Sequence, residues 1–234
     1  SVTHLFGTDD LGRDVFSRVI IAARPSVMVS LVSVTLALLA GVSIGLVSGF
    51  FGGWVDVTGM RMMDVIFSFP VMLLALAIVA MLGPGIVPAM LAIAIGDTPF
   101  CARSTRASVL TVREETDIKA ARSIGASTAR ILRLHVLPNI MAAILVQPSL
   151  SRAFAILTEA ALSFLGLGVQ PPTPSWGRML FDGRGFLPDA WWIALFPGAA
   201  IFLTVLALNL VGDAMRDALD PRQRSAIESR RGNL

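Results

Sequence analysis

The sequence contains no tyrosine, a single cysteine and two histidines among its 234 residues. One cysteine excludes an intramolecular disulfide and supplies no zinc-ligand spacing, so we expect Cys101 to be a small buried apolar residue and expect no metal centre. The lack of tyrosine also argues against a base-stacking surface, because the remaining aromatic residues lie in or near long apolar stretches. Nucleic acid is therefore not an expected partner.

Charged residues make up only 15% of the chain, against about a quarter in an ordinary soluble domain, and 55% of the residues are hydrophobic. The mean hydropathy is +0.75. The charges are clustered, so that residues 25–55, 65–96 and 190–212 contain no ionisable side chain. Each of these runs is longer than the roughly 20 apolar residues that cross about 30 Å of hydrocarbon. The clustering indicates a chain that crosses a bilayer several times.

The middle run is long enough for two short spans, and the stretch GPGIVP at 83–88 supplies a Gly/Pro turn between them. This pattern predicts an all-α, polytopic helical membrane protein with five spans. We expect the spans at about residues 26–49, 64–82, 87–103, 140–164 and 190–212.

Most of the 19 lysine and arginine residues fall on one side of this arrangement, and basic residues accumulate in cytoplasmic loops. The C-terminus is therefore expected in the cytosol and the N-terminus outside. This arrangement requires either a further span before residue 1, which we favour, or an N-terminus that crosses the membrane unaided. We divide the chain into an external or interfacial segment 1–25, three spans within 26–103, a cytoplasmic loop 104–139, two spans within 140–212 joined by an external loop 165–189, and a cytoplasmic tail 213–234.

The segment DIKAARSIGASTARILRLHVLPN occupies residues 117–139. Each of its charged side chains would cost about 2.5 to 3.5 kcal/mol at a bilayer centre, so the segment must lie outside the lipid. Its alanines favour a helix, Gly125 interrupts that helix, and Ser127 or Thr128 can cap a second helix that is expected to end before Pro138. The predicted structure is a bent helical hairpin, which by itself is either a docking element or a solvated amphipathic connector.

Several residues of this segment stand at a characteristic spacing, namely Ala120, Ala121, Gly125, Leu137 and Pro138. The pattern resembles the cytoplasmic loop of ABC-importer permeases, whose signature is Glu-Ala-Ala, three residues, Gly, nine residues, Ile, one residue and Leu-Pro. Lys119 stands where that family usually has Glu, and His135 where it usually has Ile. The resemblance implies a type I importer permease fold in which these residues, Lys119 included, couple the chain to an ATPase.

Three further blocks, at residues 6–18, 157–180 and 194–222, are similar to the second permease of the dipeptide, oligopeptide and nickel importers. The resemblance implies a multi-pass permease of the bacterial inner membrane that imports peptides, with dipeptides the first expectation. Nickel complexes, haem and glutathione stay open as cargo. The implied partners are membrane lipid, a sister permease, an extracytoplasmic binding protein and two cytoplasmic ATPases, which bind ATP and Mg.

The chain itself has no Gly-x4-Gly-Lys-Ser/Thr loop, so it is not expected to be an enzyme or to bind a cofactor. An intramembrane enzyme would need a facing nucleophile and base, or a motif such as His-Glu-x-x-His, and the sequence shows neither. An ATP-independent channel or secondary carrier is the alternative of another class. Such a carrier would often show internal repeats, which are not visible in these spans.

Ionisable side chains at membrane depth are rare and usually face protein or water, which singles out Asp97, Arg152 and Glu159. Arg152 and Glu159 are seven residues apart on one helical face, about 10 Å in rise. We expect these residues either to line the pathway and meet the charged ends of a peptide, or to make structural hydrogen bonds.

The external loop carries four residues that are candidates for contact with a binding protein: Trp176, Arg178, Asp182 and Arg184. A plain interfacial loop with a tryptophan anchor is the other interpretation.

Overall fold

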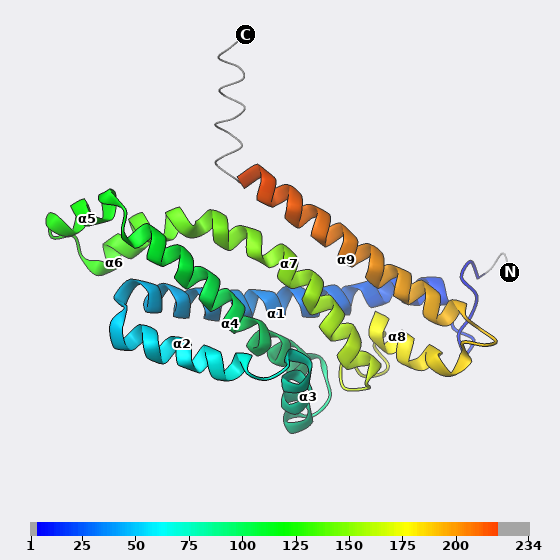
Figure 1. Ribbon diagram of the computed structural model, residues 1–234. Coiled ribbons are helices and arrows are strands. Elements are labelled where there is room, and N and C mark those ends of the chain that lie inside the picture. The colour runs from blue at the N-terminus through cyan, green and yellow to red at the C-terminus, as the bar shows by residue number, and fades with distance from the viewer. Residues whose placement is uncertain (1–3, 220–234) are drawn as a thin grey trace, which may run out of the picture.

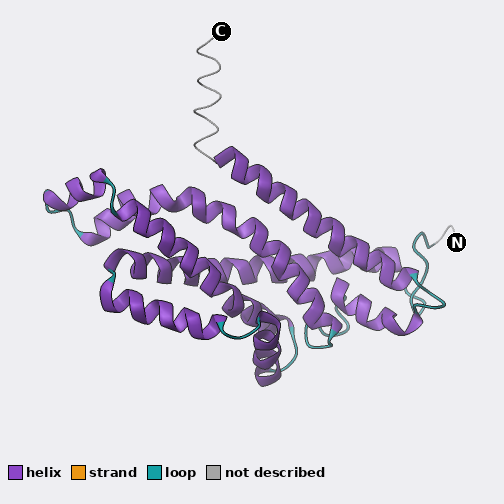
Figure 2. Cartoon of the chain, viewed as in Figure 1, coloured by secondary structure: helices purple, strands orange, loops and turns teal. Residues whose placement is uncertain are grey.

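A computed structural model describes residues 4–219, except for the side chains of residues 142–143, 146–150, 216 and 219. The regular structure in this range is helical, apart from an isolated bridge between Thr8 and Asp14 (Figure 2). The elements are α1 (Val15–Phe51), α2 (Gly53–Phe67), α3 (Val71–Leu82), α4 (Ile86–Arg113), α5 (Thr116–Ser123), α6 (Thr128–Ile131), the π-helix η1 (Leu132–Val136), α7 (Leu137–Phe164), α8 (Trp176–Gly183), the 3₁₀-helix η2 (Arg184–Phe186) and α9 (Trp192–Leu219).

Three of these helices, α1, α4 and α9, are individually long and apolar enough to cross a membrane. The 37 residues of α1 correspond to roughly 55 Å of helix, which exceeds the hydrocarbon thickness. Because α1 already begins at Val15, the expected external segment 1–25 is helical over its second half. Most of the segment 213–234, expected to be a cytoplasmic tail, lies outside the described residues.

The span expected at 64–82 has a different form in the structure. The chain turns directly after α1 into α2, and α2 and α3 are bent by 87° at the break between them. Pro70 causes this break, because it cannot donate a backbone hydrogen bond and disfavours the helical conformation of the residue before it. By length and composition, α2 and α3 together form either one broken span or a re-entrant pair, and residues 53–67 are helical ahead of the expected start of the span.

The most extensive helix contact joins α1 to α4 and depends on glycines spaced by four residues. A Cβ at Gly41 would lie 2.5 Å from Cys101 Cβ, and one at Gly49 would lie 2.9 Å from Val109 Cβ. Small residues at this spacing let helix backbones approach closely. Cys101 is fully buried in this contact, which confirms the expectation of a small buried residue.

Ion pairs attach α2 to the same helix. Arg106 forms a two-pronged pair with Asp56, with both N to O distances 2.5 Å, and Arg103 bonds Asp64 at 2.7 Å. Figure 1 shows the result: α5 and α6 lie at one end of the bundle, while α8 lies at the other end near the start of α1. The two candidate functional regions are thus separated by the full length of the bundle.

Candidate functional site

The first helix of the hairpin and the interruption at Gly125 form as predicted, whereas the second helix differs from the prediction. Gly125 ends the turn after α5 with a φ of +79°, a conformation that favours glycine, and Ser127 stands at the N-cap of α6 in an extended conformation. The expectation that the second helix ends before Pro138 is wrong. The chain continues through η1 into α7, and Pro138 occupies the first turn of α7, where its missing N–H costs nothing.

The buried face of the hairpin packs on the C-terminal ends of α1 and α4. Ile118, Ala121 and Ile131 join Phe50 and Val109 in one apolar cluster. This arrangement makes the hairpin part of the folded bundle and not a freely moving connector.

Two arginines strengthen the attachment to α1. The Arg113 guanidinium donates to the carbonyl oxygens of Gly49 and Phe50 at 3.0 and 3.4 Å, where the helix leaves its last carbonyls without partners. The Arg122 guanidinium lies 5.1 Å from the centre of the Phe50 ring, within cation–π range. These contacts attach the end of α4 and the helix α5 to the end of α1.

This packing bears on Ala121, one of the residues expected to couple the chain to an ATPase, because its side chain faces the protein's own core. Ala121 is 6% exposed and contacts its own chain, whereas Ala120 is exposed and Ile124 is 85% exposed. An arginine at position 121 would disrupt the chain's own core before it affected a partner. The sequence analysis did not single out Ile124. The signal was present, because Ile124 is an apolar residue directly before the helix-breaking Gly125.

The outer face of the hairpin holds a groove of about 610 Å³. Its lining combines small and apolar residues with a few charged or polar ones: Asp117, Ala120, Ala121, Ile124, Gly125, Ala126, Ser127, Arg130 and His135. Lys119 lies outside this lining and pairs with Glu114 at 3.3 Å, and the hydrogen bond from Lys119 lowers the pKa of Glu114. Leu137 packs partly on the apolar cluster beneath the hairpin, and Pro138 is exposed.

The three ionisable residues at membrane depth lie in different environments. Asp97 in α4 and Arg152 in α7 are partly buried, and within the described residues Asp97 Oδ2 and Arg152 Nε have no hydrogen-bond partner. Glu159 is 0% exposed and accepts a hydrogen bond from Ser163 Oγ at 2.7 Å. Its complete burial within this chain argues against the expected contact with a substrate.

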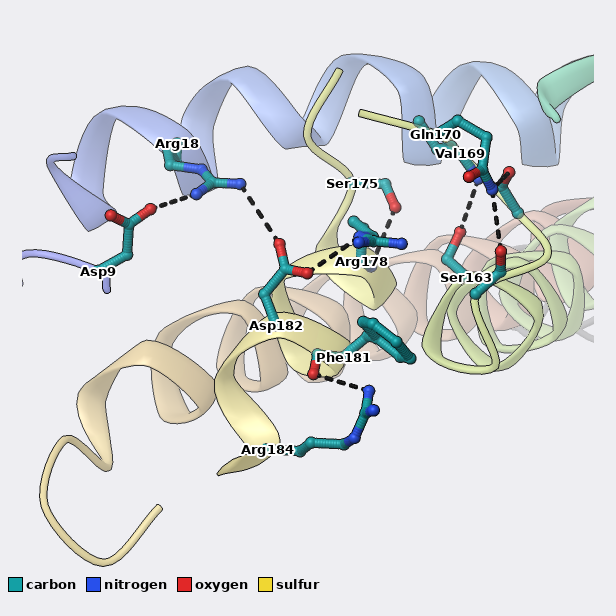
Figure 3. Close-up of polar contacts among 12 residues, drawn as sticks. Asp9, Arg18, Ser163, Val169, Gln170, Ser175, Arg178, Phe181, Asp182 and Arg184 are labelled. Atoms are coloured by element: carbon teal, nitrogen blue, oxygen red, sulfur yellow. Dashed lines mark hydrogen bonds and ion pairs between the residues drawn. The ribbon is translucent and has the colours of Figure 1, made fainter. Parts of the chain in front are cut away.

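At the opposite end of the bundle, alternating charges connect the segment before α1 to α8 (Figure 3). Asp9 pairs with Arg18, Arg18 lies 3.9 Å from Asp182, and Asp182 lies 3.0 Å from Arg178. Burial alone would raise the pKa of Asp9, but hydrogen bonds from Arg13 and Arg18 hold it below its ordinary value. The chain of charges fastens α8 to the start of α1.

The residues expected to contact a binding protein divide into two groups. Trp176 is 4% exposed and donates its indole N–H to the carbonyl of Val19 at 2.9 Å, so the structure does not support a surface contact for it. Arg178 and Asp182 are partly exposed, while Arg184 is exposed and stacks 3.6 Å from the centre of the Phe181 ring. Asp182 also lines two clefts of about 310 and 200 Å³.

Comparison with known proteins identifies the family. Residues 41–225 match the model described as a binding-protein-dependent transport system inner membrane component. The chain is 48% identical over 225 residues to the dipeptide transport system permease protein DppC of Alkalihalophilus pseudofirmus, covering 96% of this chain and 74% of that protein. It is 49% identical over 222 residues to the di/tripeptide permease DppC of Pseudomonas aeruginosa, with coverages of 95% and 73%. It is 45% identical over 225 residues to the glutathione transport system permease protein GsiD of Pectobacterium atrosepticum, with coverages of 96% and 75%.

Solved structures share the fold at lower sequence identity. The inward-facing MetNI methionine ABC transporter, in its native crystal form, gives a TM-score of 0.70 at 17% identity, covering 88% of this chain and 97% of that one. An amino acid ABC transporter crystallised with histidines gives 0.67 at 17% identity, with coverages of 87% and 94%. These likenesses show the fold alone and confirm the predicted importer-permease fold. With the family model and the curated relatives in agreement, this chain belongs to the binding-protein-dependent transport system inner membrane components, the permease subunits of ABC importers.

Proposed function

We propose that this chain forms, with a sister permease, the pathway through which an ATP-driven importer moves small peptides such as dipeptides from a binding protein into the cytosol. The observation that carries the proposal is the exposed groove on the hairpin, fixed to α1, α4 and α7 at the end of the bundle. The names of the two relatives above that carry di- or tripeptides support this cargo. Glutathione is the alternative cargo, on the name of a third relative.

The hairpin is the proposed docking element for a cytoplasmic ATPase, which binds the ATP and Mg. Ala120, Ile124 and Gly125 give the groove an apolar floor that a partner can approach closely. Lys119 borders this surface with charge, while Leu137 and Pro138 set where α7 begins. Closure of two ATPases would move the hairpin as a rigid body and tilt the helices attached to it. This assignment places the C-terminus of α9 on the cytoplasmic side.

Arg152 is the proposed contact for the peptide carboxylate. A partly buried cation at the expected membrane depth is costly unless it faces water or an anion, and no ion pair neutralises Arg152 within the described residues. Asp97 is the proposed second polar group of the pathway. At the outer end, Arg178, Asp182 and Arg184 present the charges that a binding protein would meet.

The test is to reconstitute the assembly in lipid with its binding protein and to measure the ATPase rate with and without dipeptides and glutathione. Ala120→Arg fills the groove and is expected to abolish the peptide-stimulated rate without preventing membrane insertion. Ala129→Arg is the matched control, because Ala129 is an exposed alanine of the same hairpin that does not line the groove. ATP-independent flux, with no ATPase bound to the permease, would overturn the proposal in favour of a channel or carrier.

A further inference from the structure

Glu159 and three serines form a buried polar cluster where α1, α7 and α8 meet. The Glu159 carboxyl accepts the 2.7 Å hydrogen bond from Ser163 Oγ and is approached by the hydroxyl groups of Ser26 and Ser175. Glu159 and the three serines are each 0% exposed. Glu159 Oε2 makes no hydrogen bond within the described residues. An ionisable group is expensive to keep at this depth, so the cluster calls for a functional explanation.

Each serine also holds a backbone N–H of the segment that runs from the α7–α8 loop into α8. The bonds are Val169 N to Ser163 Oγ at 3.1 Å, seen in Figure 3, Trp176 N to Ser26 Oγ at 3.3 Å, and Arg178 N to Ser175 Oγ at 3.2 Å. A hydroxyl oxygen that accepts from a backbone N–H still has its own proton to donate. The Glu159 carboxyl therefore orients the Ser163 hydroxyl directly and lies beside those of Ser26 and Ser175, and the three hydroxyls together fix the loop and the first turn of α8.

The backbone around this cluster leaves little room for displacement. A Cβ at Gly177 in α8 would lie 2.6 Å from Ala160 Cα of α7, and a Cβ at Gly168 in the loop would lie 2.9 Å from Ser163 Cα. These contacts are between backbones, so α8 and α7 are in direct contact beside Glu159. A small movement of α8 is expected to be transmitted to α7 rather than absorbed by flexible side chains.

We infer that Glu159 is a positioning residue that transmits the docking of the binding protein at α8 to the ATPase-facing hairpin. The inference rests on the proposed function. The helix that carries Glu159 near its outer end is the one that begins at the hairpin, and α7 is continuous over its 28 residues. Figure 1 shows α7 extending between α8 and the α5–α6 end of the bundle. Glu159 acts through α8 and its loop, and it does not contact the peptide.

The first measurement is the ratio of the ATPase rates with and without the peptide-loaded binding protein, in reconstituted wild-type and variant assemblies. Glu159→Ala removes the acceptor of the Ser163 hydroxyl from the centre of the serine cluster, whereas Glu159→Gln retains an acceptor oxygen in a side chain of the same shape. Gly177→Ala pushes α8 away from α7 without touching the carboxyl. Gly185→Ala is the matched control, because a Cβ there meets nothing within 4 Å. We expect Glu159→Ala and Gly177→Ala to lower the ratio by about fivefold or more at an unchanged basal rate, and Glu159→Gln to lower it less.

A second measurement does not depend on transport. Thr173 is exposed in the α7–α8 loop, and the native Cys101 is buried, so Thr173→Cys is expected to react selectively with a membrane-impermeant maleimide. The labelling rate of Thr173→Cys should rise when Glu159→Ala is also present, and it should not rise when Gly185→Ala is present instead.

The outcomes separate the two proposals. A wild-type assembly that is not stimulated by its loaded binding protein would overturn the proposed function, whatever the labelling result. Normal wild-type stimulation with unchanged ratios in Glu159→Ala and Gly177→Ala would overturn only the role of Glu159. A parallel fall of basal and stimulated rates would overturn it too, because Glu159 would then act on assembly alone.

Discussion

Replacing Gly45 by alanine is expected to destabilise the protein although it adds one methyl group. A Cβ at this position of α1 would lie 2.8 Å from Thr105 Cβ and 2.9 Å from Arg106 N, and it would also strike the carbonyl oxygen of Ala102. Most of these atoms belong to the backbone of α4, so no side chain can rotate away. Restoring ordinary contact requires the two helices to separate by more than about half an ångström, and overpacking of this kind costs roughly 1 to 3 kcal/mol.

Alanine has the higher helix propensity, which offsets up to about 1 kcal/mol of this cost, so overpacking is expected to prevail. The thermal midpoint of the detergent-solubilised chain should fall on the order of 5 °C. Gly198→Ala is the matched control within α9, because its Cβ would meet Leu180 Cδ2 at an ordinary 3.9 Å. Equal midpoints for the Gly45 and Gly198 variants would refute the conclusion that α1 and α4 are held by backbone contact.

Three further perturbations follow from the polar contacts. Arg152→Gln is expected to slow import of peptides with a free carboxylate while leaving their affinity for the binding protein unchanged, and uptake of matched peptide amides should be affected less; equal loss for both would contradict a carboxylate contact. Either single change Asp56→Arg or Arg106→Asp should lower the thermal midpoint, and the double variant should recover part of the loss; no recovery would show that the pair is not what joins α2 to α4. Hydrogen bonds hold the pKa of Asp9 below its ordinary value, so the contribution of Asp9 to stability is complete above that ordinary value and is lost as the pH falls through the folded-state pKa. Asp9→Asn should therefore weaken the acid dependence of the thermal midpoint below about pH 4. An unchanged pH profile would contradict this reasoning.

The spans were predictable where a single physical rule decides them. Long runs without charge require helices in a bilayer, because every backbone polar group must be paired there, and α1, α4 and α9 follow from this rule. The hairpin is predicted to lie outside the lipid because of the cost of inserting its charges. Gly125 was readable as the break in the hairpin because its positive φ suits glycine.

Two prolines have opposite effects in the structure, which the residue type alone does not distinguish. Pro70 breaks a helix, and the residues before it turn the chain by 87° between α2 and α3. Pro138 starts a helix, because its position in the first turn of α7 needs no N–H donor. The two prolines differ in the helix that precedes them. Pro138 follows the π-helical turn η1, which connects α6 to α7 and has no evident signature in the sequence.

Arg152 and Glu159 show why the site could be found but not assigned. They stand seven residues apart on one face of α7, and the sequence alone gives both the same interpretation. The α7–α8 loop and α8 cover the outer end of α7, where Ser26 and Ser175 approach the Glu159 carboxyl from positions far apart in the chain. In the part of the chain that the structure describes, no comparable set of hydroxyls surrounds the Arg152 side chain. The Ser30 hydroxyl donates to the backbone carbonyl of Arg152 and not to its side chain. Equal spacing therefore does not give equal surroundings: Glu159 is enclosed by its own chain, whereas Arg152 is partly buried without an ion pair in the described residues, and this difference is the basis for proposing a structural role for the one and a peptide contact for the other.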